Sequence, residues 1–261
     1  MPTALITGAS AGLGAEFARQ LAARGYDLVL VARDGARLDA LALDLAARFG
    51  VRAEPLVADL LDPDALARVE ARLSATDAPV DYLVNNAGFG LPREFDENSA
   101  DEEERQLELL ATVPLRLSHA TLAQMLPRRS GTILTVASVA GFAGLGSYSA
   151  AKSWALTFSR WANAYYRSSG VTFTAVAPGF VRTEFHERMG IQRESMAPRL
   201  AWLDAPLVVR QALRHADRRK AVSIPSVRYR LLIAVLPLLG GVVRAGVARR
   251  GTARRGRSAR P

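Results

Sequence analysis

The sequence T-A-L-I-T-G-A-S-A-G-L-G, residues 3–14, opens with a short apolar run and continues into a glycine-rich turn. The amphipathic segment from Ala15 to Arg24 follows, and Gly25 ends it. A strand, a glycine-rich turn and a helix in this order are typical of phosphate binding. Glycine lets the backbone come close to the ligand, and the helix N-terminus offers unpaired N–H groups and a positive dipole end. The start of the chain therefore predicts a phosphate-binding turn between a strand and a helix.

The alternation of strands and helices continues along the chain. We predict strands at residues 3–7, 27–32, 53–57, 80–84, 132–136, 171–176 and 222–224. Helices are predicted at residues 34–49, from Asp62 and Pro63 onward, and at 101–125, 148–168 and 207–215. This pattern predicts an α/β fold with a doubly wound, parallel, Rossmann-type sheet of about seven strands, whose ligands lie at the carboxyl ends of the strands. We expect a single domain over residues 1–225, and an apolar and basic extension over residues 226–261.

The composition excludes several kinds of site. The chain has 261 residues, of which 49% are hydrophobic and 23% are charged, as in an ordinary globular domain. The absence of cysteine excludes disulfides and thiolate metal sites, and His119, His186 and His215 are too scattered to suggest zinc, so we expect no metal. The first residues lack the basic and apolar regions of a signal peptide, so we expect a cytoplasmic protein.

The net charge of +9 belongs mainly to the end of the chain. Seven arginines and no acidic residue lie between Arg244 and the C-terminus, so residues 1–243 carry a net charge of only +2. This basic run has no interleaved aromatic residues and no folded reading surface, and we therefore expect no nucleic-acid partner.

The segment S-Y-S-A-A-K, residues 147–152, carries a candidate catalytic pair. On a helix, Tyr148 and Lys152 lie one above the other on one face. A nearby cation favours the phenolate and lowers the pKa of a tyrosine, so Tyr148 is predicted to donate a proton to a carbonyl oxygen. The alternative interpretation is a surface tyrosine and lysine on an ordinary helix.

Two strand ends carry candidate cofactor residues. Arg33 follows the second strand, nineteen residues after Gly14, where an NAD enzyme would have an acidic residue for the ribose 2′-hydroxyl. A guanidinium suits a 2′-phosphate, which favours NADP(H) over NAD(H). The alternative is a solvent-exposed arginine at a strand end. After the fourth strand, Asn85-Asn86-Ala87-Gly88 falls where a strand end would meet a cofactor.

Taken together, these motifs resemble the short-chain dehydrogenases/reductases over about residues 3–225. The matching motifs, in chain order, are T-G-A-S-A-G-L-G at 7–14, Asp59, N-N-A-G at 85–88, Ser138, Y-x-x-x-K at 148–152 and P-G-x-V-x-T at 178–183. The resemblance implies an oxidoreductase that transfers hydride between nicotinamide and a carbonyl compound or secondary alcohol. It also implies a homo-oligomer formed through the helices that include residues 101–125 and 148–168.

The resemblance assigns roles to individual residues. Tyr148 would be the general acid, Lys152 would hold the nicotinamide ribose and lower the pKa of the tyrosine, and Ser138 would bond the substrate oxygen. Together with Arg33 at the strand end, the cofactor-binding residues would be Gly8, Ser10, Gly12, Leu13, Gly14, Asp59, Asn86, Gly88, Tyr148, Lys152, Pro178, Val181 and Thr183. Among them, Val181 and Thr183 would engage the nicotinamide carboxamide.

Two departures from the family pattern bear on activity. Leu110 stands where the family usually has an asparagine that organises a proton-relay water, and the spacing from Ser138 to Tyr148 is ten residues, three shorter than usual. Either the loop 139–147 is pulled tight, or Ser138 no longer lies beside Tyr148 and catalysis is weakened. A second hypothesis is therefore a catalytically attenuated NADP(H)-binding sensor or scaffold.

The segment 184–205 is long, irregular and rich in large apolar residues, namely Phe185, Met189, Met196 and Trp202. Such a segment in a single domain predicts a lid, here over a hydrophobic or acyl-type substrate.

The C-terminal apolar run Leu231 to Val243 is thirteen residues long, too short for a bilayer, which takes about twenty. One interpretation is peripheral membrane contact through residues 228–250, with arginines on anionic headgroups. The other is a helix packed on the body or on an oligomer partner, followed by a disordered polar tail.

Overall fold

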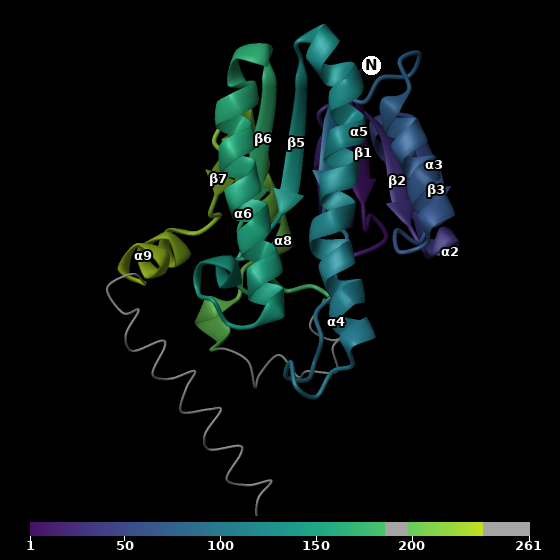
Figure 1. Ribbon diagram of the computed structural model, residues 1–261. Helices are drawn as coiled ribbons and strands as arrows, with labels where there is room; N and C mark the ends of the chain where they lie inside the picture. The colour runs from purple at the N-terminus through teal and green to yellow at the C-terminus, as the bar shows by residue number, and fades with distance from the viewer. Residues whose placement is uncertain (186–197, 237–261) are drawn as a thin grey trace, which may run out of the picture.

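The computed structural model describes residues 1–185 and 198–236 (Figure 1). Its described strands form one sheet of seven, in the order β3-β2-β1-β4-β5-β6-β7, and every neighbouring pair is parallel. The strands are β1 (Thr3–Thr7), β2 (Asp27–Ala32), β3 (Ala53–Val57), β4 (Tyr82–Asn85), β5 (Gly131–Val136), β6 (Val171–Val176) and β7 (Val222–Ser223). The predicted Rossmann-type sheet is confirmed.

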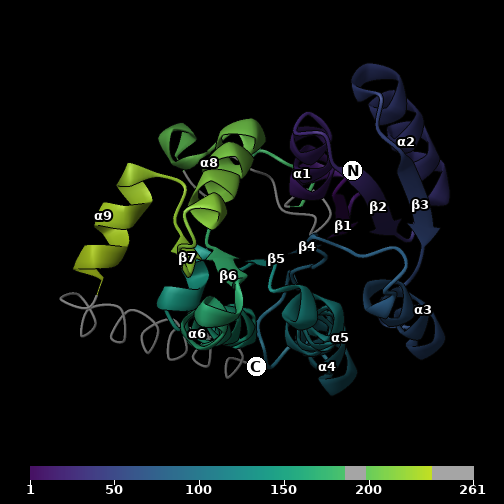
Figure 2. The same ribbon diagram turned by 90° about the horizontal axis from the view of Figure 1, so that it is seen from above.

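Helices cover both faces of the sheet (Figure 2). On one face lie α1 (Gly12–Ala22), α2 (Gly35–Phe49) and α8 (Ala205–Asp217). On the other face lie α3 (Pro63–Ser74), α4 (Ala100–Leu107), α5 (Val113–Arg128) and α6 (Ser147–Tyr166). A short helix near the C-terminus, α9 (Val227–Val235), lies beyond β7 at the side of the molecule.

The two layers bury alternate residues of the same strands. In β1, Ala4 and Ile6 belong to the core that faces α1, α2 and α8, whereas Leu5 belongs to the core on the opposite face. Side chains of a strand point to opposite faces in turn, so a strand covered on both sides reads as a continuous apolar run. This burial explains why the apolar run at the start of the chain predicts its strand.

Aspartate side chains cap the start of two helices. Asp34 accepts a hydrogen bond from the Arg37 N–H at the start of α2, and Asp62 accepts one from the Ala65 N–H at the start of α3. The predicted helix over residues 101–125 is instead split, because a π-helical turn at Glu108–Thr112 separates α4 from α5. Pro114 explains this break, since proline cannot donate a backbone hydrogen bond and its ring crowds the carbonyl four residues earlier.

The C-terminal extension begins with α9, which starts at Val227, four residues before the predicted start. The rest of the predicted apolar run, residues 237–243, lies outside the described residues, as do Met189 and Met196 of the predicted lid. None of the described helices has the length and apolar character needed to cross a bilayer. The domain boundary at residue 225 stays a prediction.

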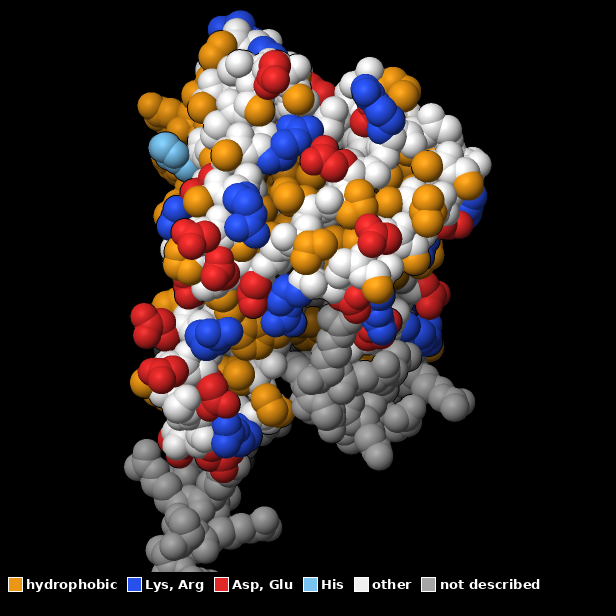
Figure 3. Space-filling view, turned by 90° about the vertical axis from the view of Figure 1, so that its right-hand side faces the viewer, with side chains coloured by type: hydrophobic (Ala, Val, Ile, Leu, Met, Phe, Trp, Pro, Cys, Tyr) orange, Lys and Arg blue, Asp and Glu red, His pale blue; other side chains and the backbone are white. Residues whose placement is uncertain are grey.

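The body of the molecule carries charges of both signs. Figure 3 shows acidic and basic side chains interspersed over the face that includes α2 and α3. Many of these charges are paired: Arg48 with Asp44, Arg72 with Glu54 and Arg116 with Glu70 are examples. This face of the domain therefore lacks the excess of basic residues that the C-terminal sequence has.

Candidate active site

The candidate site lies at the carboxyl edge of the sheet, where the strand order reverses between β1 and β4. In doubly wound folds this reversal opens a crevice that binds the ligand. The turn after β1 and the segments after β4, β5 and β6 all reach this edge (Figure 1). Val139 after β5 donates a backbone hydrogen bond of 3.0 Å to Pro178 after β6, which joins two of these segments.

The glycine-rich turn after β1 can be made only with glycine. Gly8 and Gly12 have φ of +66° and +56°, in the left-handed region that side chains disfavour. A Cβ on Gly14 would lie 2.1 Å from the carbonyl oxygen of Gly8 and 2.6 Å from Nδ2 of Asn86. The turn thus closes tightly on itself and on the end of β4.

The N-terminus of α1 fits the pyrophosphate of a dinucleotide. Its N-cap, Ala11, makes no side-chain capping bond, and the first turn has no acidic residue to oppose an anion. Its first N–H groups therefore remain available to a phosphate. On the far side, a Cβ on Gly12 would lie 3.2 Å from Cβ of Thr183, so the segment after β6 borders the same space. Ser10 and Leu13 belong to this turn and first helical residues, and both are partly buried.

Asn86 braces the two central strands. Its Nδ2 donates to the carbonyl oxygens of Thr7 at 2.9 Å and Gly8 at 3.2 Å. The Thr7 hydroxyl oxygen accepts from the backbone N–H groups of Asn86 at 2.9 Å and Ala87 at 3.0 Å. Asn86 therefore lies beside the glycine-rich turn, where its side-chain donors hold the ends of β1 and β4 together.

Arg33 and Asp59 lie at the ends of the adjacent strands β2 and β3. Nη1 of Arg33 is 4.0 Å from Oδ2 of Asp59, and the Arg33 side chain is 72% exposed. The other carboxylate oxygen of Asp59 accepts a hydrogen bond of 3.1 Å from the Leu61 N–H, which fixes the carboxylate. An exposed guanidinium beside an anchored carboxylate fits the phosphate-bearing end of an adenosine, because it can bind a 2′-phosphate in bidentate fashion.

Ser138, Tyr148 and Lys152 come together at the ends of β5 and α6. The Ser138 hydroxyl hydrogen-bonds the Tyr148 hydroxyl, and Lys152 Nζ lies 5.7 Å from the centroid of the Tyr148 ring. Lys152 Nζ also donates a hydrogen bond of 2.7 Å to the carbonyl oxygen of Val136, at the end of β5. A phenol, an alcohol and an ammonium therefore converge at the edge of the sheet that also carries the glycine-rich turn.

Burial governs the titration of this cluster. It raises the pKa of Tyr148 to about 12, an effect that the hydrogen bond with Ser138 opposes. Burial also lowers the pKa of Lys152 to about 8. For the cofactor-free chain, the predicted lowering of the tyrosine pKa by its neighbouring ammonium is therefore wrong. The physical reason is that burial disfavours the charged form of each group, and Lys152 donates to a backbone carbonyl.

The shortened loop after Ser138 is pulled tight. Residues Val139–Phe142 form a 3-10 helix whose N-cap is Ser138, and the serine side chain accepts a hydrogen bond of 3.1 Å from the Ala140 N–H. Ser149, next to Tyr148, hydrogen-bonds the carbonyl oxygen of Ala140. Of the two alternatives left by the sequence, the structure has the tight loop with Ser138 beside the tyrosine.

Leu110 lies next to Gly88 at the site. It lies in the π-helical turn, is 2% exposed, and its Cδ2 is 2.8 Å from the position of a Cβ on Gly88. The same Cβ position is 3.9 Å from Nζ of Lys152. An apolar side chain therefore fills the space next to Gly88 and Lys152, where a relay asparagine was expected.

The described parts of the predicted lid border the site in different ways. The Phe185 ring lies 6.5 Å from the Tyr148 ring, centroid to centroid, at an interplanar angle of 47°. Trp202 is buried instead and packs on Phe180, with centroids 5.4 Å apart. Val181 and Leu203 form a parallel β-bridge, so the segment after β6 is joined to the residues that return after the undescribed stretch.

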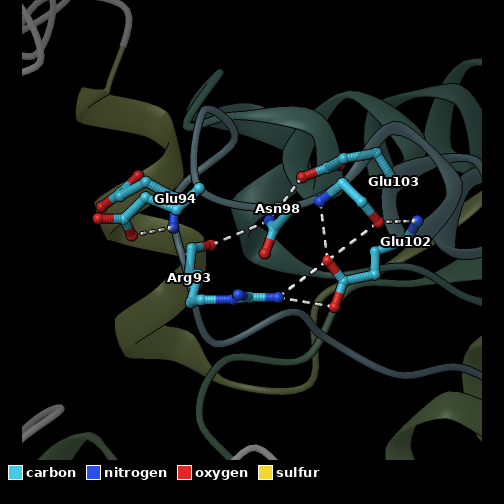
Figure 4. Close-up of polar contacts among 7 residues, drawn as sticks. Arg93, Glu94, Asn98, Glu102 and Glu103 are labelled. Carbon is cyan, nitrogen blue, oxygen red and sulfur yellow. Dashed lines mark hydrogen bonds and ion pairs between the residues drawn. The ribbon is translucent and has the colours of Figure 1, made fainter.

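The loop at residues 89–99, which leads from the N-N-A-G motif to α4, is held by charged and polar side chains (Figure 4). Arg93 donates two hydrogen bonds to Glu102, at 2.7 and 2.9 Å. Asn98 donates to the carbonyl oxygen of Arg93 at 3.3 Å and to Glu103 at 2.7 Å. The start of α4 is thereby fastened to the loop that leaves the crevice. Sequence reasoning missed this network, because single charged residues in a polar loop carry no distinguishing pattern.

Tyr229 of α9 was also missed. It is 8% exposed, and a Cβ on Gly179 would lie only 2.0 Å from Cζ of its ring. Its hydroxyl accepts from the Phe180 N–H at 3.2 Å and donates to the carbonyl oxygen of Ala201 at 2.8 Å. The available signal was an aromatic residue between Arg228 and Arg230, directly before the apolar run, since a buried hydroxyl needs a partner.

Comparison with known proteins agrees with this geometry. Residues 2–194 match the model of the short chain dehydrogenase family. The 3-oxoacyl-(acyl-carrier-protein) reductase of Escherichia coli K12 is 35% identical over 210 residues, which cover 76% of this chain and 83% of that protein.

Two solved structures are similar over almost the whole chain. The short-chain dehydrogenase from Sphingobium yanoikuyae in complex with NADPH is 40% identical, with a TM-score of 0.83, and 92% of this chain and 95% of that chain are covered. The bulky-bulky ketone specific alcohol dehydrogenase from Comamonas testosteroni is 34% identical, with a TM-score of 0.78, and 92% and 93% are covered.

Proposed function

The chain belongs to the short-chain dehydrogenase family, and we propose that it is an NADP(H)-dependent reductase of a hydrophobic or acyl-type carbonyl compound. The reverse reaction would oxidise the corresponding secondary alcohol. The observation that carries the proposal is the convergence of Ser138, Tyr148 and Lys152 at the edge of the sheet that also carries the glycine-rich turn.

In this mechanism the protein positions the reacting groups and supplies a proton. Bound NADPH would supply the hydride that reduces the carbonyl carbon. Ser138 hydrogen-bonds the carbonyl oxygen and orients it toward Tyr148, which gives up its hydroxyl proton as the oxygen gains charge. Lys152 would hold the cofactor ribose, and with the cofactor bound its ammonium would stabilise the phenolate that remains. Burial raises the pKa of Tyr148, so the phenol carries at neutral pH the proton that it would donate.

Replacement of Tyr148 by phenylalanine tests this role. Tyr148→Phe removes only the hydroxyl, so turnover should fall at least ~10²-fold while the Kd for NADPH stays close to that of the wild type. Tyr165→Phe, an exposed tyrosine on the same helix, is the matched control and should leave both quantities unchanged. A protein that binds NADPH but reduces none of a broad panel of ketones and aldehydes would contradict the proposed function.

The preference for NADP(H) is proposed from Arg33 at the end of β2. Its support is the exposed guanidinium and the NADPH that the similar Sphingobium structure contains. Arg33→Ala should weaken NADPH binding roughly 10- to 100-fold, the contribution of a charged hydrogen bond, and leave NADH binding unchanged. Arg48→Ala, in which an arginine of α2 is removed, is the control. Equal losses for both nucleotides would contradict a contact with the 2′-phosphate.

The substrate class is proposed from the apolar groups at the site. The Phe185 ring faces Tyr148, and the relatives named above act on 3-oxoacyl groups and on bulky ketones. Within a series of ketones of increasing apolar size, kcat/KM should therefore rise with the apolar area. A preference for small polar carbonyl compounds would contradict this substrate class.

A second candidate function is favoured by Leu110. Its apolar side chain beside Gly88 and Lys152 supports a cofactor-binding protein with attenuated catalysis. Leu110→Asn separates the two functions. A large gain in turnover would mean that the natural protein is attenuated, and an unchanged rate would mean that proton relay is achieved by other groups.

We also propose that the protein forms a homo-oligomer through α5 and α6. Trp161 and Tyr165, one turn apart on α6, are more than half exposed and stack with centroids 5.4 Å apart. Exposed aromatic side chains in a group are typical of protein interfaces. Light scattering should show a dimer or tetramer that Trp161→Glu dissociates, and a wild-type monomer would contradict the proposal. The cytoplasmic location stays a prediction.

A further inference from the structure

The inner side of α9 is fixed to the body of the protein by Tyr229. The tyrosine ring lies against Gly179, and its hydroxyl bridges the Phe180 N–H and the Ala201 carbonyl. Ile233, one turn further along the helix, is also partly buried. The side of the helix that faces the protein is therefore defined, and so is the side that faces away.

The outer side of α9 is an apolar stripe. Val227, Leu231 and Val235 follow one another at intervals of four residues, so they lie along one face of the helix, and they are 60%, 63% and 45% exposed. At about 100° per residue, Arg230 falls on one edge of this stripe, and Arg228 lies between the stripe and Leu232, which is 52% exposed. Arg228 also hydrogen-bonds the carbonyl oxygen of Leu200. An exposed apolar face that carries two arginines has the pattern of a helix that lies in a membrane interface.

The charge of the chain is confined to the same region. Residues 226–261 contain nine arginines and no acidic residue, whereas residues 1–225 contain 25 basic and 25 acidic residues. The whole net charge of +9 therefore belongs to α9 and the sequence after it. A region of this composition is complementary to an anionic surface, whose attraction adds to that of the apolar stripe.

We propose that the outer face of α9 docks on an anionic lipid bilayer. The stripe of Val227, Leu231 and Val235 would enter the boundary between headgroups and acyl chains, and the arginines would bind lipid phosphates. This inference goes beyond the proposed enzymatic function and does not depend on it. Because α9 contacts Gly179 and Phe180, directly after β6, docking would hold the carboxyl edge of the sheet next to the membrane.

The test uses the full-length protein and lipid vesicles. Cosedimentation is measured with vesicles of phosphatidylcholine alone and of phosphatidylcholine mixed with phosphatidylglycerol, at low and high salt. The wild type should bind the anionic vesicles at least tenfold more tightly than the neutral ones, and salt should weaken this binding. Arg228→Gln with Arg230→Gln should weaken it about 30-fold, since each arginine near an anionic surface contributes about fivefold.

A second double variant separates docking of the helix from adsorption of the basic sequence. Leu231→Asn with Val235→Asn should weaken binding at least tenfold, because both apolar side chains lose their place in the interface. Leu43→Asn is the control, since Leu43 is 73% exposed on α2, far from α9 (Figure 2). Circular dichroism and NADPH binding without vesicles verify that each variant is folded.

Three results would overturn the proposal. One is equal binding to neutral and anionic vesicles, or to neither. Another is unchanged binding of the Leu231/Val235 variant, which would mean that the arginines alone adsorb. The third is a wild-type oligomer that this variant dissociates without any vesicle binding, in which case a second copy of the chain covers the stripe.

Discussion

Replacing Lys152 by methionine should make the protein more stable at neutral pH while it abolishes turnover. Lys152 is 5% exposed, and its burial lowers its pKa from 10.5 to about 8. A shift of this size corresponds to about 3 kcal/mol of free energy against the buried ammonium at pH 7. Methionine has a similar length and no charge, so Lys152→Met removes this cost.

Part of the gain is offset by a lost hydrogen bond. Lys152 Nζ donates to the carbonyl oxygen of Val136 at 2.7 Å, and leaving that oxygen without its donor costs about 1 kcal/mol. The free energy of unfolding of Lys152→Met should therefore exceed that of the wild type by about 2 kcal/mol at pH 7.

The pH dependence gives the prediction its sign. Below pH 8 both the folded and the unfolded wild type hold the proton, and the full cost of the ammonium is present. Between pH 8 and 10.5 the unfolded chain binds more protons than the folded one, so the stability of the wild type rises with pH. The advantage of Lys152→Met should thus shrink as the pH rises through this range.

Urea unfolding of the wild type and of Lys152→Met at pH 7 and pH 10 measures both effects. Lys220→Met is the matched control, because Lys220 is the only other lysine of the chain and is exposed. The reasoning is refuted if Lys152→Met is less stable than the wild type at pH 7, or if the difference between them is the same at both pH values.

Two further substitutions test the surroundings of the site. Gly14→Ala would place a Cβ 2.1 Å from the carbonyl oxygen of Gly8, so the turn must shift. We expect this overpacking to lower the free energy of unfolding by about 1–3 kcal/mol, which a lower Tm would show. Fluorescence titration should show a large loss of NADPH affinity. An unchanged Tm would mean that the turn is looser than described. Tyr229→Phe keeps the ring but removes the hydroxyl bonded to Phe180 and Ala201, so stability should fall by about 1–3 kcal/mol in urea unfolding and the KM for the nucleotide should rise. If only stability falls, Tyr229 has a purely structural role.

The sheet could be predicted from the sequence because its strands are buried on both faces. In β1 the residues Ala4, Leu5 and Ile6 are all buried, and an uninterrupted apolar run is the pattern that such burial produces. The glycine-rich turn could be predicted equally well, since its backbone conformations leave few alternatives to glycine. These features depend on neighbours along the chain, which a sequence displays directly.

Features that depend on distant contacts were harder to predict. The proximity of Lys152 to Tyr148 follows from helical spacing, but the pKa of each depends on what surrounds them, and burial reversed the expected direction for the tyrosine. The position of Tyr229 against Gly179 joins residues fifty positions apart. No local pattern indicates such a contact, because it is decided by the packing of the whole fold.

The residues before and after the segment 184–198 are bonded to each other and to α9, and this matters for protein engineering. The Val181–Leu203 bridge and the Tyr229 hydroxyl fix the points at which this segment leaves and rejoins the body. Lengthening the chain between two fixed points costs little, only about 0.6 kcal/mol for each doubling of its length. We therefore predict that the length and composition of the chain between these points can be varied while the catalytic cluster remains in register on the sheet.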